Sequence, residues 1–374
     1  MAISESCLPY FSPTALLLLG VVGIQWLGLP LLAVWIAYVL LPVLDLCLPL
    51  DEANPSPSQE KLLVQQARWR VPLFVYAVVD LCTVVWFLEY MAQAQLSPFA
   101  LLAVLFTVGN FSTGGINVAH ECMHKQDFWS QLATYLELGK CLYTHFAIEH
   151  VRGHHIRVAT PLDPATARFG QSLYAFMPQS VLGGWTDAWR LEKERLGRQH
   201  KSEWTFQNAF ILGKGLEALF LLCIFYRYGY FGLGVFVAQS IVGVGFLEAV
   251  NYIEHYGLLR RKEGADYESV TPNHSWNAPF AVTNLLFFKL QRHSDHHAQG
   301  SKPYQILQSC AEAPRLPGSY PLCVVVATVP PLWFSIMHPL LEKEKGSMER
   351  FKGWLAVALV MQTGIFTAWF VLAL

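Results

Sequence analysis

Charged residues are scarce in this chain of 374 residues, at 14%, whereas soluble domains average about 25%. The net charge is -1 at pH 7, so no basic surface is indicated for nucleic acid. Hydrophobic residues reach 53%, and the mean hydropathy is +0.34. The composition therefore argues against a soluble domain or a nucleic-acid-binding protein and favours an integral membrane protein.

The eight cysteines form no Cys-x-x-Cys pair. The chain thus provides neither a zinc ribbon nor a rubredoxin-type iron site of its own. The N-terminus also has no basic region before its first apolar run, which begins near Thr14. We therefore expect a membrane span there and not a cleavable signal peptide.

Six apolar runs approach or reach the roughly 20 residues that a helix needs to cross a bilayer. They pair into hairpins with short connections, whereas the connections between pairs are long and polar. All lysines and arginines except Lys214 and Arg227 lie in the long connections or in the tail to residue 353. By the positive-inside tendency, the long connections should lie in the cytoplasm. The predicted spans are residues 13–29, 31–50, 72–92, 98–118, 207–227 and 230–250.

The predicted fold is a single all-α domain over residues 1–374, a polytopic membrane bundle with a histidine-rich di-metal cap on its cytoplasmic side. The apolar segment 320–338 contains Pro330-Pro331, so we expect it to be interfacial or re-entrant. Residues 353–374 are long enough for a seventh span. Lys214 and Glu217 lie within the fifth run and are costly in lipid, so they should face the bundle or the interface.

Three histidine clusters dominate the polar part of the sequence. The stretch 291–297 places three histidines at i, i+3 and i+4, the stretch 150–155 has a similar spacing, and a third places two at i and i+4. Such positions share one face of a helix, and imidazole is the commonest metal ligand. Nine imidazoles suit two ions with four or five ligands each, although imidazole alone accepts zinc, copper, iron or nickel. The candidates are His120, His124, His150, His154, His155, His255, His293, His296 and His297.

Acidic residues stand next to these histidines in the sequence. A neighbour on a helix points about 100° away, so we expect each carboxylate to orient the imidazole of another cluster by accepting its second N–H. Asn251 lies one turn before His255 and could hold a metal-bound water. His200 and His338 are isolated, and we expect no role at the site for them. The remaining candidates around the site are Glu121, Glu149, Glu254, Asp295, His145 and His274.

Two other readings of the histidines are open. His120-Glu121-Cys122-Met123-His124 matches the HExxH pattern of zinc metalloproteases, with Glu121 as the base. The two further histidine clusters count against that reading. A membrane metal-binding or transport protein is the non-enzymatic alternative, but transporters usually place ionisable ligands midway through their spans.

The chain resembles the integral-membrane alkane hydroxylases (alkane 1-monooxygenases), relatives of xylene monooxygenase and of membrane fatty-acid desaturases. The resemblance covers about residues 41–339. It departs from the family pattern at Cys122, at Asn273 and in the apolar C-terminal run. The stretches that carry it are 120–125, 149–155, 159–166, 274–277, Asn-Tyr-Ile-Glu-His-Tyr-Gly at 251–257 and Gln-Arg-His-Ser-Asp-His-His at 291–297.

The resemblance implies a non-haem di-iron centre held by the nine histidines above. It also implies O2 as co-substrate, electrons from a separate rubredoxin with an NAD(P)H-dependent reductase, and hydroxylation of the terminal methyl group of n-alkanes to primary alcohols. A lipid desaturase, or a hydroxylase of fatty-acyl or xylene-type substrates, is the alternative within the superfamily. The membrane would be the plasma membrane of a bacterium, or the endoplasmic reticulum or another organelle of a eukaryote.

An n-alkane has no polar handle, so its binding must come from burial, at roughly 0.8 kcal/mol per CH2. We expect an apolar slot between the spans, lined from the second run by Trp35, Ala37, Tyr38 and Leu41. The alternative is that these four side chains only pack against neighbouring helices. Trp276, Arg292 and Tyr304 are expected at the surface where the electron carrier docks.

Overall fold

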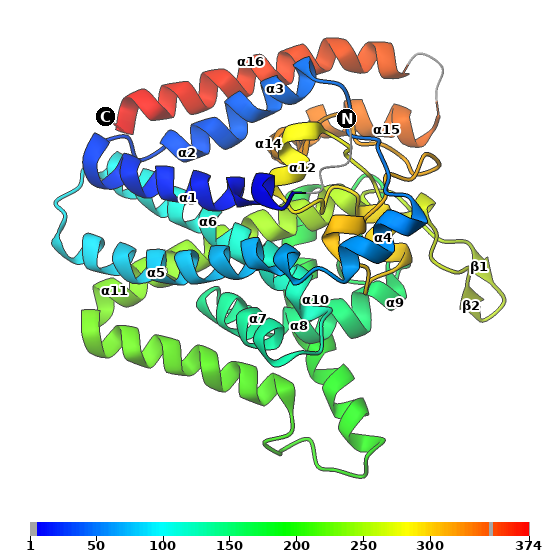
Figure 1. The fold of residues 1–374 in the computed structure, drawn as a ribbon, viewed down its shortest axis with the longest axis horizontal. Coiled ribbons are helices and arrows are strands. Elements are labelled where there is room, and N and C mark those ends of the chain that lie inside the picture. The colour runs from blue at the N-terminus through cyan, green and yellow to red at the C-terminus, as the bar shows by residue number, and fades with distance from the viewer. Residues whose placement is uncertain (1–5, 344–346, 374) are drawn as a thin grey trace.

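The protein is predominantly helical in a computed structural model, which describes residues 6–343 and 347–373. Its described strands are β1 (Lys262–Glu263) and β2 (Asp266–Tyr267), which form one antiparallel hairpin. Figure 1 shows the long apolar helices running side by side across the view, with short turns at one end and the long connections at the other. The predicted all-α class is confirmed.

Three helical hairpins form the bundle. The first has short π-helical segments within it and turns at Gly28, whose φ of 66° suits glycine. The second turns between Gln93 and Pro98, and the third bends at Gly229 (φ 63°, ψ -159°). Their elements are η1 (Leu8–Phe11), α1 (Ser12–Val22), η2 (Gly23–Leu27), α2 (Leu32–Trp35), η3 (Ile36–Leu40), α3 (Leu41–Cys47), η4 (Ala67–Arg70), α5 (Val71–Gln93), α6 (Pro98–Met123) and α11 (Ala209–His255).

Among the described residues, four helices are long and apolar enough to cross a membrane, or five if one bent pair counts as a span. The runs predicted at 207–227 and 230–250 are the two halves of α11, on either side of Gly229. The run predicted at 31–50 forms a shorter apolar helix, Leu32–Cys47. A polytopic membrane bundle is thus confirmed, and the limits of each span stay predictions.

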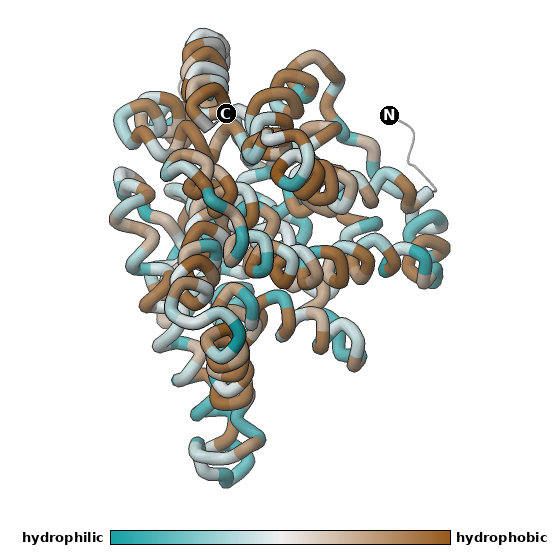
Figure 2. The backbone as a smooth tube through the Cα atoms, turned by 90° about the vertical axis from the view of Figure 1, so that its left-hand side faces the viewer, coloured by the Kyte–Doolittle hydropathy of each residue, from teal (hydrophilic) through white to brown (hydrophobic). Residues whose placement is uncertain are grey.

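Apolar side chains cover much of the outside of the bundle. Val78, Val85, Leu222 and Ile241 are each about 60% exposed or more, at 62%, 59%, 65% and 67%. Figure 2 shows hydrophobic residues along the outer helices and hydrophilic ones concentrated in loops. Exposed apolar area on this scale is unfavourable in water and favourable against lipid. The outer faces of the helices are therefore lipid-facing surfaces.

The C-terminal helices close the bundle on one side. α14 (Tyr320–Ala327) and α15 (Pro330–Leu341) meet at 120°, which fits the broken geometry expected from Pro330-Pro331. α16 (Ser347–Ala373) packs along the second helical run, where Gln362 Nε2 donates to the Tyr38 carbonyl. Leu374, the last residue of the predicted seventh run, lies outside the described residues.

The long connections form a cap at the end of the bundle away from the short turns (Figure 1). Polar side chains start several helices by accepting from the first-turn N–H groups, as Ser97, Asp127, Ser172 and Asn208 do. The cap contains α4 (Pro57–Val64), α7 (Phe128–Lys140), α8 (Phe146–Glu149), η5 (His150–His154), α9 (His155–Arg157), α10 (Leu173–Gly197), η6 (Pro272–His274), α12 (Ala281–Leu286), α13 (His293–Ala298) and η7 (Tyr304–Ile306).

Buried polar contacts fix the cap on the bundle. Asp45, at the end of the first hairpin, accepts from Val282 N at 2.6 Å and from Thr283 Oγ1, and so anchors the start of α12. Lys214 and Glu217 pair at 2.9 Å and face the bundle, as expected for charges within an apolar run. Glu217 also accepts from Thr144 N at 2.8 Å, which ties the chain before α8 to α11.

Candidate metal centre

The nine candidate histidines come from four separate segments of the chain and converge beneath the cap. Two lie at the end of α6, three in η5 and α9, one at the end of α11 and three on α13. They form two groups, and within each group one ligand atom per residue lies within 4.8 Å of all the others. The first group is His120, His124, His150, His155 and His296. The second is His154, His255, His293 and His297.

Ring nitrogens of different histidines within each group lie close together. His150 Nε2 and His155 Nε2 are 3.0 Å apart, and His255 Nε2 and His293 Nε2 are 3.1 Å apart. Other buried ring nitrogens have no hydrogen-bond partner, although buried polar atoms are normally paired. Within the two groups these are the Nε2 atoms of His120, His124, His154, His296 and His297, together with the Nδ1 atoms of His150, His293 and His297. Unpaired nitrogens converging on two points are the donor set that two metal ions require, so the residues present fit such ions.

A π-helical turn sorts the middle cluster between the two groups. Residues 150–154 form η5, and the N–H of His155 bonds to the carbonyl of His150, five residues earlier. The wider turn therefore places His155 beside His150, while His154 points to the second group. In a regular α-helix, His150 and His154 would share a face. Such turns are frequent at functional sites, and here the turn divides the ligands between two metal positions.

Burial keeps most of these imidazoles neutral. It lowers the pKa of His124 to about 4, and it lowers the pKa values of His150 and His155 well below their usual range. The same cause lowers the pKa values of the three α13 histidines. A neutral imidazole keeps the lone pair that binds a metal. The groups are therefore poised for metal ions and not for protons near pH 7.

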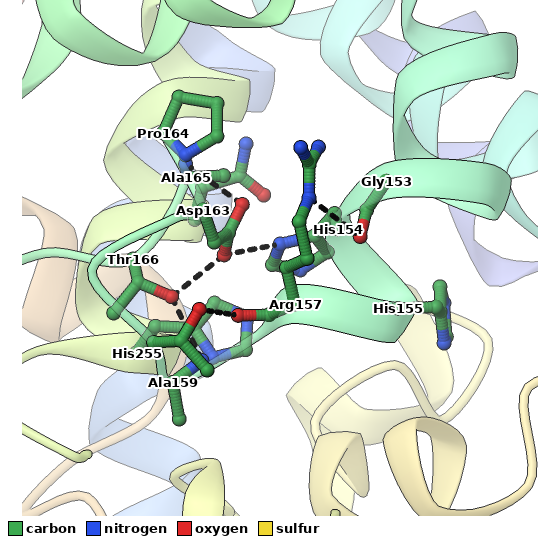
Figure 3. Close-up of polar contacts among 12 residues, drawn as sticks. Gly153, His154, His155, Arg157, Ala159, Asp163, Pro164, Ala165, Thr166 and His255 are labelled. Carbon is green, nitrogen blue, oxygen red and sulfur yellow. Dashed lines mark hydrogen bonds and ion pairs between the residues drawn. The ribbon is translucent and has the colours of Figure 1, made fainter. Parts of the chain in front are cut away.

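Asp163 is a site residue that sequence reasoning did not select. Its Oδ2 lies 2.9 Å from His154 Nδ1 and accepts from Thr166 Oγ1 at 2.6 Å, while its Oδ1 accepts from Ala165 N (Figure 3). Burial opposes the charged form of His154, but the carboxylates of Asp163, Glu149 and Glu254 together outweigh burial and raise the His154 pKa. The contact with Asp163 leaves His154 Nε2 free to face the second group, which is the usual part of a carboxylate behind a metal ligand. The segment 159–166 carries the resemblance described above, but Asp163 lies eight residues after His155, the nearest candidate histidine in the sequence. A search for acidic residues directly beside histidines therefore could not find it.

The carboxylates expected to orient imidazoles have mixed roles. Glu254 Oε2 lies 3.3 Å from Nε2 of His293, a histidine of another cluster. That nitrogen also lies 3.1 Å from His255 Nε2 within the second group, so Glu254 does not accept the second N–H of the ring, which was the role expected of it. The other three anchor backbone and basic side chains instead. Glu121 pairs with Lys125 at 3.2 Å, Glu149 with Arg157 at 3.5 Å, and Asp295 with Lys302 at 2.8 Å. Sequence adjacency alone could not assign their partners, because these are set by tertiary packing.

The other histidines lie outside the two groups. His145 Nδ1 lies 3.2 Å from Lys214 Nζ, and burial lowers the His145 pKa to about 3. His274 contacts Glu268 at 3.3 Å, and the next residue, Ser275, lies 3.4 Å from His255 Nδ1. His338 is 2.8 Å from the Tyr256 hydroxyl. His200 is exposed at the end of α10.

Two neighbouring apolar cavities lie near the site, and the inner one adjoins the histidines. The inner cavity, of about 40 Å³, is lined by His120, His150, His293 and Asn251, whose Nδ2 donates to Glu248 at 3.3 Å. The outer cavity, of about 90 Å³, contains no histidine and lies among the N-terminal hairpin, α5 and α6.

Two of the four expected slot residues, Ala37 and Tyr38, line the outer cavity. Trp35 and Leu41 are not among its lining residues, and Trp35 Nε1 instead donates to Thr367 Oγ1 at 3.2 Å. Trp35 therefore follows the packing alternative, because its side chain contacts α16, and Leu41 lies outside the cavity lining.

The surface expected for carrier docking is not formed by the residues named for it. Trp276, Arg292 and Tyr304 are all buried. Arg292 binds the carbonyls of Asp51, Ala53 and Leu307, and so holds the connection before α4 against α13. From the sequence, a long charged side chain such as that of Arg292 is expected to be exposed. Here it is buried, and its N–H groups donate to buried carbonyls.

Comparison with known proteins places the chain in a family. A family model described as fatty acid desaturase matches residues 96–327. Alkane 1-monooxygenase 2 of Pseudomonas aeruginosa is 39% identical over 314 residues, which cover 83% of each chain. Alkane 1-monooxygenase of Acinetobacter baylyi is 36% identical over 310 residues, or 81% of this chain and 74% of the relative.

The chain is also similar, at lower identity, to a monooxygenase component that is named for aromatic substrates. The xylene/toluene monooxygenase hydroxylase component of Pseudomonas putida is 30% identical over 224 residues, or 59% of this chain and 58% of the relative. With its apolar helices and paired histidine groups, the chain belongs to the alkane 1-monooxygenase family of membrane oxidoreductases, within the fatty acid desaturases.

Proposed function

We propose that this protein is a membrane di-iron monooxygenase that hydroxylates the terminal methyl group of medium- or long-chain n-alkanes to primary alcohols. It would use O2 and electrons from rubredoxin. One observation carries the proposal: two all-imidazole groups, of five and four residues, adjoin an apolar cavity beneath lipid-facing helices. Family membership supports the substrate class, since the relatives are named for alkanes.

Two iron ions are the metals that this proposal assigns to the two histidine groups. Bound iron would supply the redox chemistry by which O2 is activated. The chain itself would hold the ions through nine neutral imidazoles. Asp163 would fix the tautomer of His154, and Asn251, which faces the inner cavity, would hold a water there.

Orientation of the substrate would come from the shape of the cavities. The lining is apolar and offers no charged side chain to a hydrocarbon in the outer cavity, so each buried CH2 contributes roughly 0.8 kcal/mol. The inner cavity ends against histidines of both groups. A chain pushed to that end presents its terminal methyl, and the apolar residues around the slot keep out bulk water.

Electrons must come from another protein in this proposal. The chain has no Cys-x-x-Cys pair for a rubredoxin-type iron, so a separate rubredoxin with its NAD(P)H-dependent reductase is the proposed donor. The long connections hold most of the lysines and arginines. We therefore place the histidine cap in the cytoplasm, in the plasma or inner membrane of a bacterium, or in the endoplasmic reticulum or another organelle of a eukaryote.

Hydroxylation of an aromatic methyl group is the second candidate, favoured by the similarity to the xylene/toluene monooxygenase component. Lipid desaturation is a third outcome that product analysis separates. An alkane gives a 1-alkanol, a xylene gives a benzyl alcohol, and an acyl chain gives a double bond.

The test is to express the chain with rubredoxin and its reductase in a host that lacks alkane oxidation, feed alkanes of several lengths, and analyse products. Purified protein is assayed for iron per chain. Removing one ligand from each group, by His296→Ala or His293→Ala, should lower the iron content and abolish product. His200→Asn is the matched control, because His200 is exposed and outside both groups. A parent chain that holds iron but yields no primary alcohol from any alkane would contradict the proposal.

A further inference from the structure

The inner and outer cavities share two wall residues, Thr113 and Phe287. Thr113 lies on α6, one and two turns before Asn117 and His120, which also line the inner cavity. Phe287 approaches from the opposite side, on the turn that follows α12. Its neighbour Leu290 faces only the inner cavity. A ligand that occupies both cavities must therefore pass between Thr113 and Phe287.

The turn that carries Phe287 is held in an unusual conformation. Phe288 and Lys289 have φ values of 50° and 57°, a left-handed backbone that bulky residues rarely adopt and that often marks a functional position. Asn117 Nδ2 donates to the Phe287 carbonyl at 3.1 Å, which pins the backbone to α6. The backbone of Phe287 is thus fixed, while its half-buried ring borders open space on two sides.

Neither cavity alone can hold a chain-like substrate. Their volumes are about 40 and 90 Å³, whereas pockets for small organic ligands start at about 300 Å³. The two volumes together are also below that value, so the side chain between the cavities must move to make room for such a ligand. Joined cavities would give an extended slot from Ala37 to the histidines. The ring between them is the group that must turn aside, because Thr113 Oγ1 is held by the carbonyls of Gly109 and Gly243 at 3.2 Å.

We propose that Phe287 is a specificity-determining gate between the two cavities. Its ring separates them at rest and turns aside when an unbranched apolar chain passes from the outer cavity to the inner one. The size of the side chain at position 287 then sets which chains reach the histidines. The identity of the chain as an n-alkane rests on the proposed function, whereas the gate itself rests on the shared wall.

A photochemical test follows the chain through the protein without catalysis. The full-length protein in lipid nanodiscs is incubated with a dodecane-length alkane that carries a terminal diazirine and is then irradiated. The labelled residues are mapped by mass spectrometry. In the parent, labels are expected in the outer cavity, at Leu16 or Ala37, and in the inner cavity, at Leu290 or Val250. Phe287→Trp should reduce inner labelling at least fivefold and leave outer labelling unchanged, and Phe287→Ala should raise the inner share.

Leu285→Trp is the matched control, since it adds a similar bulk on α12 at a residue that lines neither cavity. All variants are compared for monodisperse elution and thermal unfolding. Because the two Phe287 variants have opposite expected effects, either one that folds decides the question. Inner labelling that is equal in the parent and the variants would overturn the gate, as would the absence of label from both cavities.

The same variants separate the gate from the proposed reaction. If labelling follows the side chain at 287 but the parent yields no alcohol from any alkane, the gate stands and the proposed substrate falls. If the parent makes 1-alkanols and the labelling of the inner cavity does not depend on the side chain at position 287, the proposed function stands and the gate is rejected.

Discussion

At the scale of the residue, position in the tertiary fold decides which carboxylates serve the histidines. Glu121, Glu149 and Asp295 are direct sequence neighbours of candidate ligands, yet they pair with lysine or arginine. Asp163 is remote in sequence and contacts His154 at 2.9 Å. A carboxylate that touches the far nitrogen of a ligand both orients the ring and increases its basicity.

Replacing Asp163 should therefore weaken metal binding without removing a ligand. Asp163→Ala is expected to lower metal affinity by about 10- to 100-fold, because His154 loses the contact that aims its Nε2 at the second group. Metal retained per chain is measured at equilibrium against a chelator series. Glu194→Gln, which alters only an exposed pair with Arg190, is the control and should retain parent affinity. Equal affinities for both variants would count against the orienting role of Asp163.

Ala37 lines the outer cavity, and its small side chain leaves depth for a longer chain. Ala37→Trp should shorten the preferred alkane by several carbons, since each CH2 that loses its place forfeits roughly 0.8 kcal/mol of burial. Product yields are compared across a series of alkane lengths. Trp35→Phe is a suitable comparison, because Trp35 lies outside the cavity lining. An unchanged length preference in the Ala37 variant would reject the assignment.

At the scale of the element, helix packing near the site depends on a fully buried charge cluster. Asp80 on α5 and Glu137 on α7 both pair with Lys140, and all three side chains are buried. Gly115 of α6 lies directly against them, and an added Cβ would meet atoms of all three. Because buried ion pairs tolerate little displacement, this glycine permits the close approach of α5, α6 and α7.

Gly115→Ala should accordingly destabilise the protein, by about 1–3 kcal/mol as overpacking typically does. The measurement is thermal unfolding of the purified protein in detergent, followed by circular dichroism. Gly245→Ala is the matched control, because no atom lies within 4 Å of the Cβ it would add. There the substitution should be neutral or stabilising by up to about 1 kcal/mol. A Gly115 variant as stable as the control would contradict the packing account.

At the scale of the whole molecule, short turns and long connections lie at opposite ends of the bundle (Figure 1). The histidine groups therefore sit at one surface, in contrast to the midway ligands usual in transporters. The lysine and arginine distribution predicts that this surface is cytoplasmic.

Sidedness can be tested with a pair of single substitutions. In intact bacterial cells, Gln95→Cys, in the short turn between α5 and α6, should react with a membrane-impermeant maleimide above the background of the parent. Ser202→Cys, in the long loop after α10, should react only after the cells are opened. Both positions are exposed, so access to the reagent and not burial sets the result. The reverse pattern would place the histidine cap outside.

If rubredoxin is the electron donor, as proposed above, its docking should depend on ionic strength. Rubredoxins are acidic, and the cap holds most of the basic residues, so raising salt should lower the turnover rate when the carrier is limiting. Turnover is measured from low salt to about 0.5 M, with saturating carrier as the control, where the effect should vanish. A rate independent of salt under carrier-limiting conditions would argue against electrostatic docking.

The sequence alone determined the helical class, the apolar runs and the nine candidate histidines, because hydrophobic length and ligand spacing are local properties of a chain. It also indicated the break at Pro330-Pro331. It did not reveal how the nine histidines divide, because a π-helical turn at 150–154 reassigns His154 and His155 between groups. Nor did it reveal Asp163, the burial of Arg292 or the wall at Phe287, because each depends on contacts between distant segments that only the packed fold brings together.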